Sequence, residues 1–146
     1  MQRAQRRQQL TAALLAAVAA AASDWAYLAV IHGQDTVPPL PAIVPFVSGY
    51  IGAIAVAAVI GLACVLAGRM PAAKTLFLAA AAGSAALGFI AILSIGVALF
   101  ITAALLSVAA QSIPPVQRPN FWLWPMSGAI LAIVGLIAGF VLVGTF

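Results

Sequence analysis

Long apolar stretches alternate with short polar ones along the whole chain. At 1.5 Å of rise per residue, a helix of about 20 apolar residues crosses a hydrocarbon core about 30 Å thick. The pattern therefore predicts an all-α transmembrane helical bundle of about five spans, in a single domain over residues 1–146. The predicted spans are about 10–31, 45–67, 72–92, 97–111 and 126–143.

The longest uncharged stretch, residues 75–111, is interpreted as two spans. As one straight helix it would be about 55 Å long, which is more than a bilayer accommodates. Two helices of about 17 residues fit if the turn between them is tight. Ser94 and Gly96 supply local polarity and backbone freedom, so the turn is placed at 93–96. A re-entrant hairpin is the alternative.

The run Phe89-Ile90-Ala91-Ile92-Leu93-Ser94-Ile95-Gly96-Val97-Ala98-Leu99 leads into Ala103-Ala104-Leu105. It resembles the Ser-Ile-Gly hairpin turn of small uncharacterised bacterial polytopic membrane proteins. The resemblance covers about a quarter of the chain. It implies a tight helical hairpin and no particular activity.

Composition strengthens the membrane interpretation. The chain has six basic and two acidic residues, and 66% of it is hydrophobic. A water-soluble domain of this length could not cover its surface with so few charges. A lone cysteine, Cys64, excludes an intrachain disulfide. The scattered cations do not form the basic face that a nucleic-acid partner requires.

The distribution of charge predicts the orientation. With the N-terminus cytoplasmic and the C-terminus external, all six cations face the cytoplasm, which satisfies the positive-inside rule. The setting expected is a bacterial plasma (inner) membrane, with the first span an uncleaved signal-anchor rather than a signal peptide. His32 and Asp35 then face outward. The six cations are Arg3, Arg6, Arg7, Arg69, Lys74 and Arg118.

Small residues recur at four-residue spacing in three spans, and neither a charge repeat nor a heptad is visible. Such residues let membrane helices approach closely. They are interpreted as helix-packing surfaces, either within the chain or toward a second copy or another protein. Gly135 and Gly139 form a GxxxG pair. The predicted set is Gly49, Ala53, Ala57, Gly61, Ser84, Gly88, Gly128, Ala132, Gly135 and Gly139.

Asp24 is the acidic residue inside a predicted span, and Ser23 precedes it. An unpaired carboxylate in hydrocarbon costs at least about 2.5 kcal/mol. Asp24 is therefore either a site for a proton, a cation or a partner, or a wetted residue near the outer surface. In the second case, Trp25 and Tyr27 mark an aromatic belt.

A second aromatic group, Phe121, Trp122 and Trp124, precedes the last span in a loop with four prolines. Aromatic side chains at this position are typical of anchors at headgroup depth. A docking surface for another protein on the cytoplasmic side is the alternative.

The inventory of reactive side chains argues against an enzyme, unless an active site is shared with another chain. The chain has one His, one Cys, two Asp and no Glu, too few for a metal centre or for general acid–base catalysis. No metal or cofactor is expected. The function expected is a non-catalytic accessory, assembly or scaffold subunit of a larger membrane complex, contacting lipid and other subunits or a second copy. A small oligomeric transporter or channel using Asp24 is the alternative, and a lipid-handling role is a third.

Overall fold

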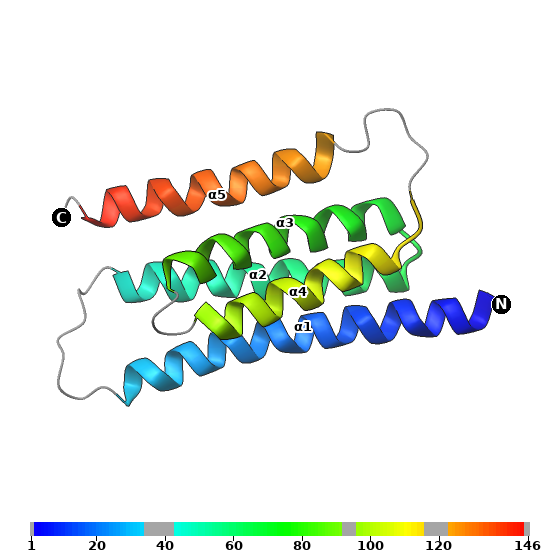
Figure 1. The fold of residues 1–146 in the computed structure, drawn as a ribbon, viewed down its shortest axis with the longest axis horizontal. Coiled ribbons are helices and arrows are strands. Elements are labelled where there is room, and N and C mark those ends of the chain that lie inside the picture. The colour runs from blue at the N-terminus through cyan, green and yellow to red at the C-terminus, as the bar shows by residue number, and fades with distance from the viewer. Residues whose placement is uncertain (1, 34–42, 92–95, 116–122, 145–146) are drawn as a thin grey trace.

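Helices make up nearly all of the described part of this computed structural model, which covers residues 2–33, 43–91, 96–115 and 123–144. Within those ranges the five helices run alternately in opposite directions along a common axis (Figure 1). The predicted all-α fold is therefore confirmed. The helices are α1 (Gln2–His32), α2 (Ile43–Leu66), α3 (Met70–Ile90), α4 (Gly96–Ser112) and α5 (Leu123–Gly144).

The first four helices form a closed ring, and α5 lies outside it. Helix α1 contacts α2 and α4, and α3 also contacts α2 and α4. Helix α5 packs mainly on α3 and touches α2 much less. In Figure 1, α5 lies along one side of the molecule next to α3, and α1 lies on the opposite side. The ring is the core, and α5 is an outer layer.

Each helix of the ring contains a series of buried positions that are spaced alternately three and four residues apart, with further buried residues beside some of them. An average spacing of 3.5 residues is typical of left-handed helix bundles, in which side chains interlock between neighbouring helices. The spacing is hidden in the sequence because the lipid-facing positions are also apolar. The series is 13, 16, 20, 23 and 27 in α1; 47, 51, 54, 58, 61 and 65 in α2; 73, 77, 80, 84 and 87 in α3; and 96, 99, 103, 106, 110 and 113 in and after α4. The other buried positions of these helices are 9, 17, 81, 83, 88, 102 and 109.

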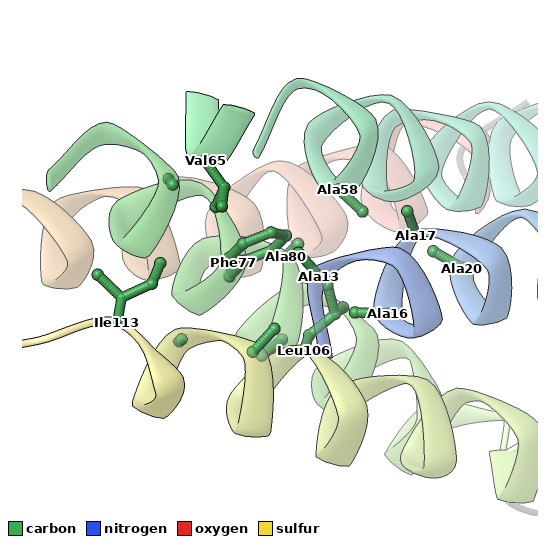
Figure 2. Packing of buried hydrophobic residues seen from close by; sticks show 14 of the residues in the cluster. Ala13, Ala16, Ala17, Ala20, Ala58, Val65, Phe77, Ala80, Leu106 and Ile113 are labelled. Carbon is green, nitrogen blue, oxygen red and sulfur yellow. The ribbon is translucent and has the colours of Figure 1, made fainter. Parts of the chain in front are cut away.

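The interior of the four-helix ring is built mostly from small side chains packed around one large aromatic side chain, that of Phe77. Figure 2 shows Phe77 of α3 surrounded by alanines from α1 and by aliphatic residues from α2 and α4. Phe77 is fully buried, as are Ala16 and Leu106. Small residues bring the helix backbones close, so that many weak contacts can form in the absence of a hydrophobic driving force between helices in lipid.

Three of the described helices are long and apolar enough to cross a membrane, namely Ala4–His32, Pro45–Leu66 and Met70–Ile90. Two shorter apolar helices, Gly96–Ser112 and Pro125–Gly139, accompany them. These properties indicate a membrane protein. Each helix matches a predicted span to within a few residues, except that α1 begins about eight residues before position 10.

Helix α4 is short, yet it returns to the level at which α3 begins. Two side chains from neighbouring helices bind carbonyl groups at its C-terminal end. The amide nitrogen of Gln9 donates to the Ser112 carbonyl at 3.1 Å, and the ammonium of Lys74 donates to the Ile113 carbonyl at 3.3 Å. Both carbonyls would otherwise lack helical partners. The stretch 75–111 is thus two antiparallel helices, although residues 93–95 of the predicted turn lie outside the described residues.

Gly68 makes the tight turn between α2 and α3 possible. Its φ of 73° is left-handed, a conformation that glycine adopts without a steric penalty. The Arg69 N–H donates to the Cys64 carbonyl at 2.8 Å, and the Gly68 N–H donates to the Val65 carbonyl at 3.1 Å. This pair of bonds is the Schellman ending of a helix. Pro71 then begins α3 in its first turn, where its missing N–H costs nothing.

Candidate functional site

Asp24 lies at the contact between α1 and α2. Its carboxylate accepts a hydrogen bond from the Ser48 hydroxyl at 3.5 Å, a long distance for such a bond. Its other oxygen faces Gly52, where an added Cβ would lie 3.8 Å away. The residue is half-buried and lies about 12 Å along the helix from the end of α1 at His32. Asp24 therefore faces a neighbouring helix in the part of the bundle near the C-terminal end of α1.

Ser23 faces a different neighbour from Asp24. Its hydroxyl lies 2.8 Å from the Thr102 hydroxyl of α4, and both side chains are buried. The Ser23 hydroxyl also lies 2.9 Å from the Ala19 carbonyl, and the Thr102 hydroxyl lies 3.0 Å from the Ala98 carbonyl. Each hydroxyl has one proton, so one of the two donates to the other, and the second donates to a carbonyl. The pair joins α1 to α4 through side chains while each hydroxyl stays within reach of its own helix backbone.

Ser84 of α3 lies at the same level as this hydroxyl pair. A Cβ added at Gly88 would lie 3.2 Å from the Leu99 Cβ, so these two residues are at the same level. Because α3 and α4 run in opposite directions, Ser84, one turn before Gly88, is level with Thr102, about one turn after Leu99. Ser84 is fully buried, and its hydroxyl has no hydrogen-bond partner among the described residues. Three hydroxyls therefore form a polar layer between the two apolar clusters of the bundle.

The two serines of this layer are expected to respond oppositely to alanine substitution. Ser23→Ala removes a side-chain bond between helices and should lower the free energy of unfolding by about 0.6–1.5 kcal/mol. Ser84→Ala removes a buried hydroxyl without a partner and should leave that free energy unchanged or raise it. Unfolding of the purified variants by SDS in mixed micelles measures both. A larger loss for Ser84→Ala than for Ser23→Ala would contradict the assignment.

The predicted small residues of α2 become progressively more buried along the helix, from Gly49 to Gly61. Gly49 has open space around it, since an added Cβ would meet nothing within 4 Å. Ala53 is exposed and Ala57 is half-buried. Gly61 faces Phe77, whose ring carbon Cε1 would lie 2.8 Å from an added Cβ. The inner end of this row packs within the ring, and the outer end remains on the surface.

The predicted small residues of α5 also divide between two roles. Gly128 packs on α3, where an added Cβ would lie 3.0 Å from the Ala79 Cβ. The carbonyl of Ala132 accepts a hydrogen bond from the Tyr50 hydroxyl at 2.9 Å, and Gly139 lies directly against the ring of Phe46. Gly135, the other half of the GxxxG pair, has nothing within 4 Å of an added Cβ.

A shallow groove of about 190 Å³ remains between α2, α3 and α5. Its walls are mostly alanine and glycine, so a helix backbone could approach its floor closely. Ala53 and Ala57 of the predicted α2 row and Ala132 of α5 lie along it. The residues that line it are Tyr50, Ala53, Ile54, Ala57, Ala79, Ala80, Gly83 and Ala132.

The aromatic residues predicted as interfacial anchors have different surroundings. Trp25 is 74% exposed, whereas Tyr27 is buried in a cluster with Val47 and Leu99. Trp124 lies in the first turn of α5, and its side chain lies outside the described set. Phe121 and Trp122 also lie outside the described residues.

The described residues contain no group of three His, Cys, Asp or Glu side chains that could hold a metal ion. The ring nitrogen Nδ1 of His32 lies 2.8 Å from the Leu28 carbonyl, one turn back on its own helix. Asp35 lies outside the described residues. No family model, curated protein or solved structure matches this chain, so the geometry alone supports the proposals below.

Two polar contacts were missed by the sequence analysis. Gln9 and Lys74 bind the end of α4, and neither had been assigned a structural role. Gln9 stands in a run with Gln5 and Gln8, and its near-complete burial distinguishes it only once the helices are packed. No local signal in the sequence separates it from its neighbours.

Proposed function

We propose that this chain is a non-catalytic accessory, assembly or scaffold subunit of a larger membrane complex. The observation that carries the proposal is the groove between α2, α3 and α5, whose small side chains leave a closely approachable surface outside a filled four-helix ring. Small residues are the main means by which membrane helices associate. A helix of another subunit is the proposed occupant.

The proposed setting is a bacterial plasma membrane crossed five times, with the N-terminus cytoplasmic and the C-terminus external. Two features support five crossings: the helices alternate in direction, and α4 returns to the level of the start of α3. Arg6, Arg69 and Lys74 lie at the end of the bundle where α1 begins. Cations are favoured on the cytoplasmic side of a membrane.

Filling the groove should weaken association. Ala53→Phe places a large ring in the groove, and co-purification of other membrane subunits with the tagged chain in native nanodiscs should fall about tenfold, equivalent to about 1.4 kcal/mol. Ala63→Phe is the matched control, because Ala63 is an exposed alanine of the same helix outside the groove. Equal retention by the two variants, or an equal loss, would contradict the proposal.

A small oligomeric transporter or channel is the second candidate. It is favoured by the Asp24 carboxylate, which faces the Ser48 hydroxyl across the α1–α2 contact and offers oxygen ligands to a cation. The ring interior is filled by side chains, so this function requires several copies. It predicts cation or proton flux in proteoliposomes that Asp24→Asn abolishes. Absence of flux with the unmodified protein would remove it.

A further inference from the structure

The Asp24 carboxylate has a single hydrogen-bond donor within the described part of the bundle. The Ser48 hydroxyl donates to its Oδ1 atom at 3.5 Å, which is long for such a bond. The described residues offer the carboxylate no other hydrogen bond and no ion pair. An acidic side chain at membrane depth is costly unless a cation or several hydrogen bonds compensate its charge. The described part of the bundle therefore leaves this charge uncompensated.

The described basic side chains lie at the opposite end of the bundle from Asp24. Arg6 and Arg7 are in the first turns of α1, and Arg7 is about 26 Å along the helix from Asp24. Arg69 lies in the turn between α2 and α3, and Lys74 lies one turn into α3, both at that same end. An ion pair requires the charged atoms to be within about 4 Å of each other, so none of these four side chains neutralises the carboxylate.

A second copy of this chain would not supply the missing charge either. Copies that insert in the same orientation hold these four cations at one level, where α1 begins. The same separation of about 26 Å along the bundle axis then remains between those cations and the Asp24 of a neighbouring copy. A compensating cation on a protein helix must therefore belong to a different chain.

Small residues lie beside Asp24 where its side chain reaches the surface. The side chain is half-buried in the seam between α1 and α2, and Gly52 faces its second carboxylate oxygen. Ala21, three residues before Asp24, is exposed. Gly49, which follows Ser48, has open space around it. A helix of another protein can thus approach the carboxylate closely.

We propose that Asp24 pairs with a Lys or Arg side chain on a transmembrane helix of the partner subunit. This inference rests on the proposed function and adds the chemistry of the partner. The partner helix contacts the α1–α2 seam at Ala21 and Gly49, and its cation donates hydrogen bonds to the carboxylate oxygens. Ala53, which lines the groove between α2, α3 and α5, is one turn after Gly49. The seam and the groove are therefore adjoining parts of one surface.

The charge is tested with Asp24→Asn and Asp24→Glu in the tagged full chain, isolated in native nanodiscs. Asp24→Asn keeps the size of the side chain but removes its charge, so retention of the partner subunit should fall about tenfold. Asp24→Glu keeps the charge and should retain most of the partner. Equal retention by the two variants would overturn the pairing. In SDS unfolding, Asp24→Asn should match the unmodified chain; a large loss of stability would overturn the proposal by placing the partner of Asp24 within the chain.

Ala21→Phe and Ala22→Phe form a matched pair for the position of the contact. Both alanines are exposed residues of α1. At 100° per residue, Ala21 lies about 60° around the helix from Asp24, whereas Ala22 lies about 160° away, on the opposite face. Ala21→Phe should lower retention of the partner about fivefold by preventing close approach, and Ala22→Phe should leave retention unchanged. Equal effects of the two substitutions would overturn the proposed position.

The retained subunit itself provides the decisive test. Once it is identified by peptide sequencing, it must contain a Lys or Arg within a membrane span. Asp24→Lys, combined with replacement of that cation by aspartate, should restore the retention that either change alone abolishes. A retained subunit without such a cation, or exchanged charges that do not restore retention, would overturn this inference and leave the proposed function intact. Absence of any foreign subunit with the unmodified chain would contradict both.

Discussion

Replacing Gly96 by alanine is expected to lower the free energy of unfolding by about 2–4 kcal/mol, because the added methyl group meets backbone that cannot rotate away. A Cβ at Gly96 would lie 2.6 Å from the Gly88 carbonyl oxygen and 2.9 Å from the Ala91 carbonyl oxygen. The Gly96 N–H also donates to the Ala91 carbonyl at 2.9 Å. The start of α4 must therefore shift away from α3, the helix on which it packs. SDS unfolding in mixed micelles measures the loss.

Gly135→Ala is the control for this substitution. Gly135 is also a helical glycine, but an added Cβ would meet nothing within 4 Å. Alanine favours helix over glycine by about 1 kcal/mol, so this variant should be neutral or slightly stabilised. Similar unfolding curves for Gly96→Ala and Gly135→Ala would show that α3 and α4 do not approach each other as described.

The second large effect is expected at the contact between Gly61 and Phe77. Phe77→Ala should cost about 2–3 kcal/mol, mainly through the cavity left behind, because the ring is also among apolar groups when the helices are separated in lipid. Gly61→Leu should cost about 1–3 kcal/mol by overpacking, since Phe77 ring atoms lie 2.8–3.2 Å from a Cβ added at Gly61.

The double variant is the sharper test of this contact. Leucine at 61 can occupy part of the space that alanine at 77 vacates, so the double variant should be more stable than the sum of the two single effects by at least about 1 kcal/mol. Gly49→Leu on the same helix is the control and should have little effect, because Gly49 faces open space. Strict additivity would contradict direct packing between positions 61 and 77.

The positions of the helices could be predicted from the sequence because each is a long apolar run. The division of 75–111 into two helices followed from length alone, since one helix would exceed the thickness of a bilayer. The arrangement of the helices could not be predicted. A heptad is recognised by contrast between apolar and polar positions, and here the exposed positions, such as Val56 and Ile60, are as apolar as the buried Ile54 and Ala58.

The sequence pointed to Ser23 and Asp24 as candidate site residues, but it did not predict which helices their side chains contact. Ser23 and Asp24 are adjacent in sequence, but successive residues in a helix point about 100° apart. The two side chains therefore contact α4 and α2 respectively. Tyr27 had been interpreted together with Trp25, yet its side chain is buried and that of Trp25 is exposed. Which side of a helix faces a neighbour depends on contacts between distant segments, and no spacing within this chain specifies them.

The most direct test of the proposed function is the composition of the native assembly. The tagged chain would be isolated from its own membrane in nanodiscs without detergent exchange, and the intact assembly would be weighed by native mass spectrometry. An accessory subunit predicts a different membrane protein present in fixed stoichiometry with this chain. An assembly containing only copies of this chain would contradict that function.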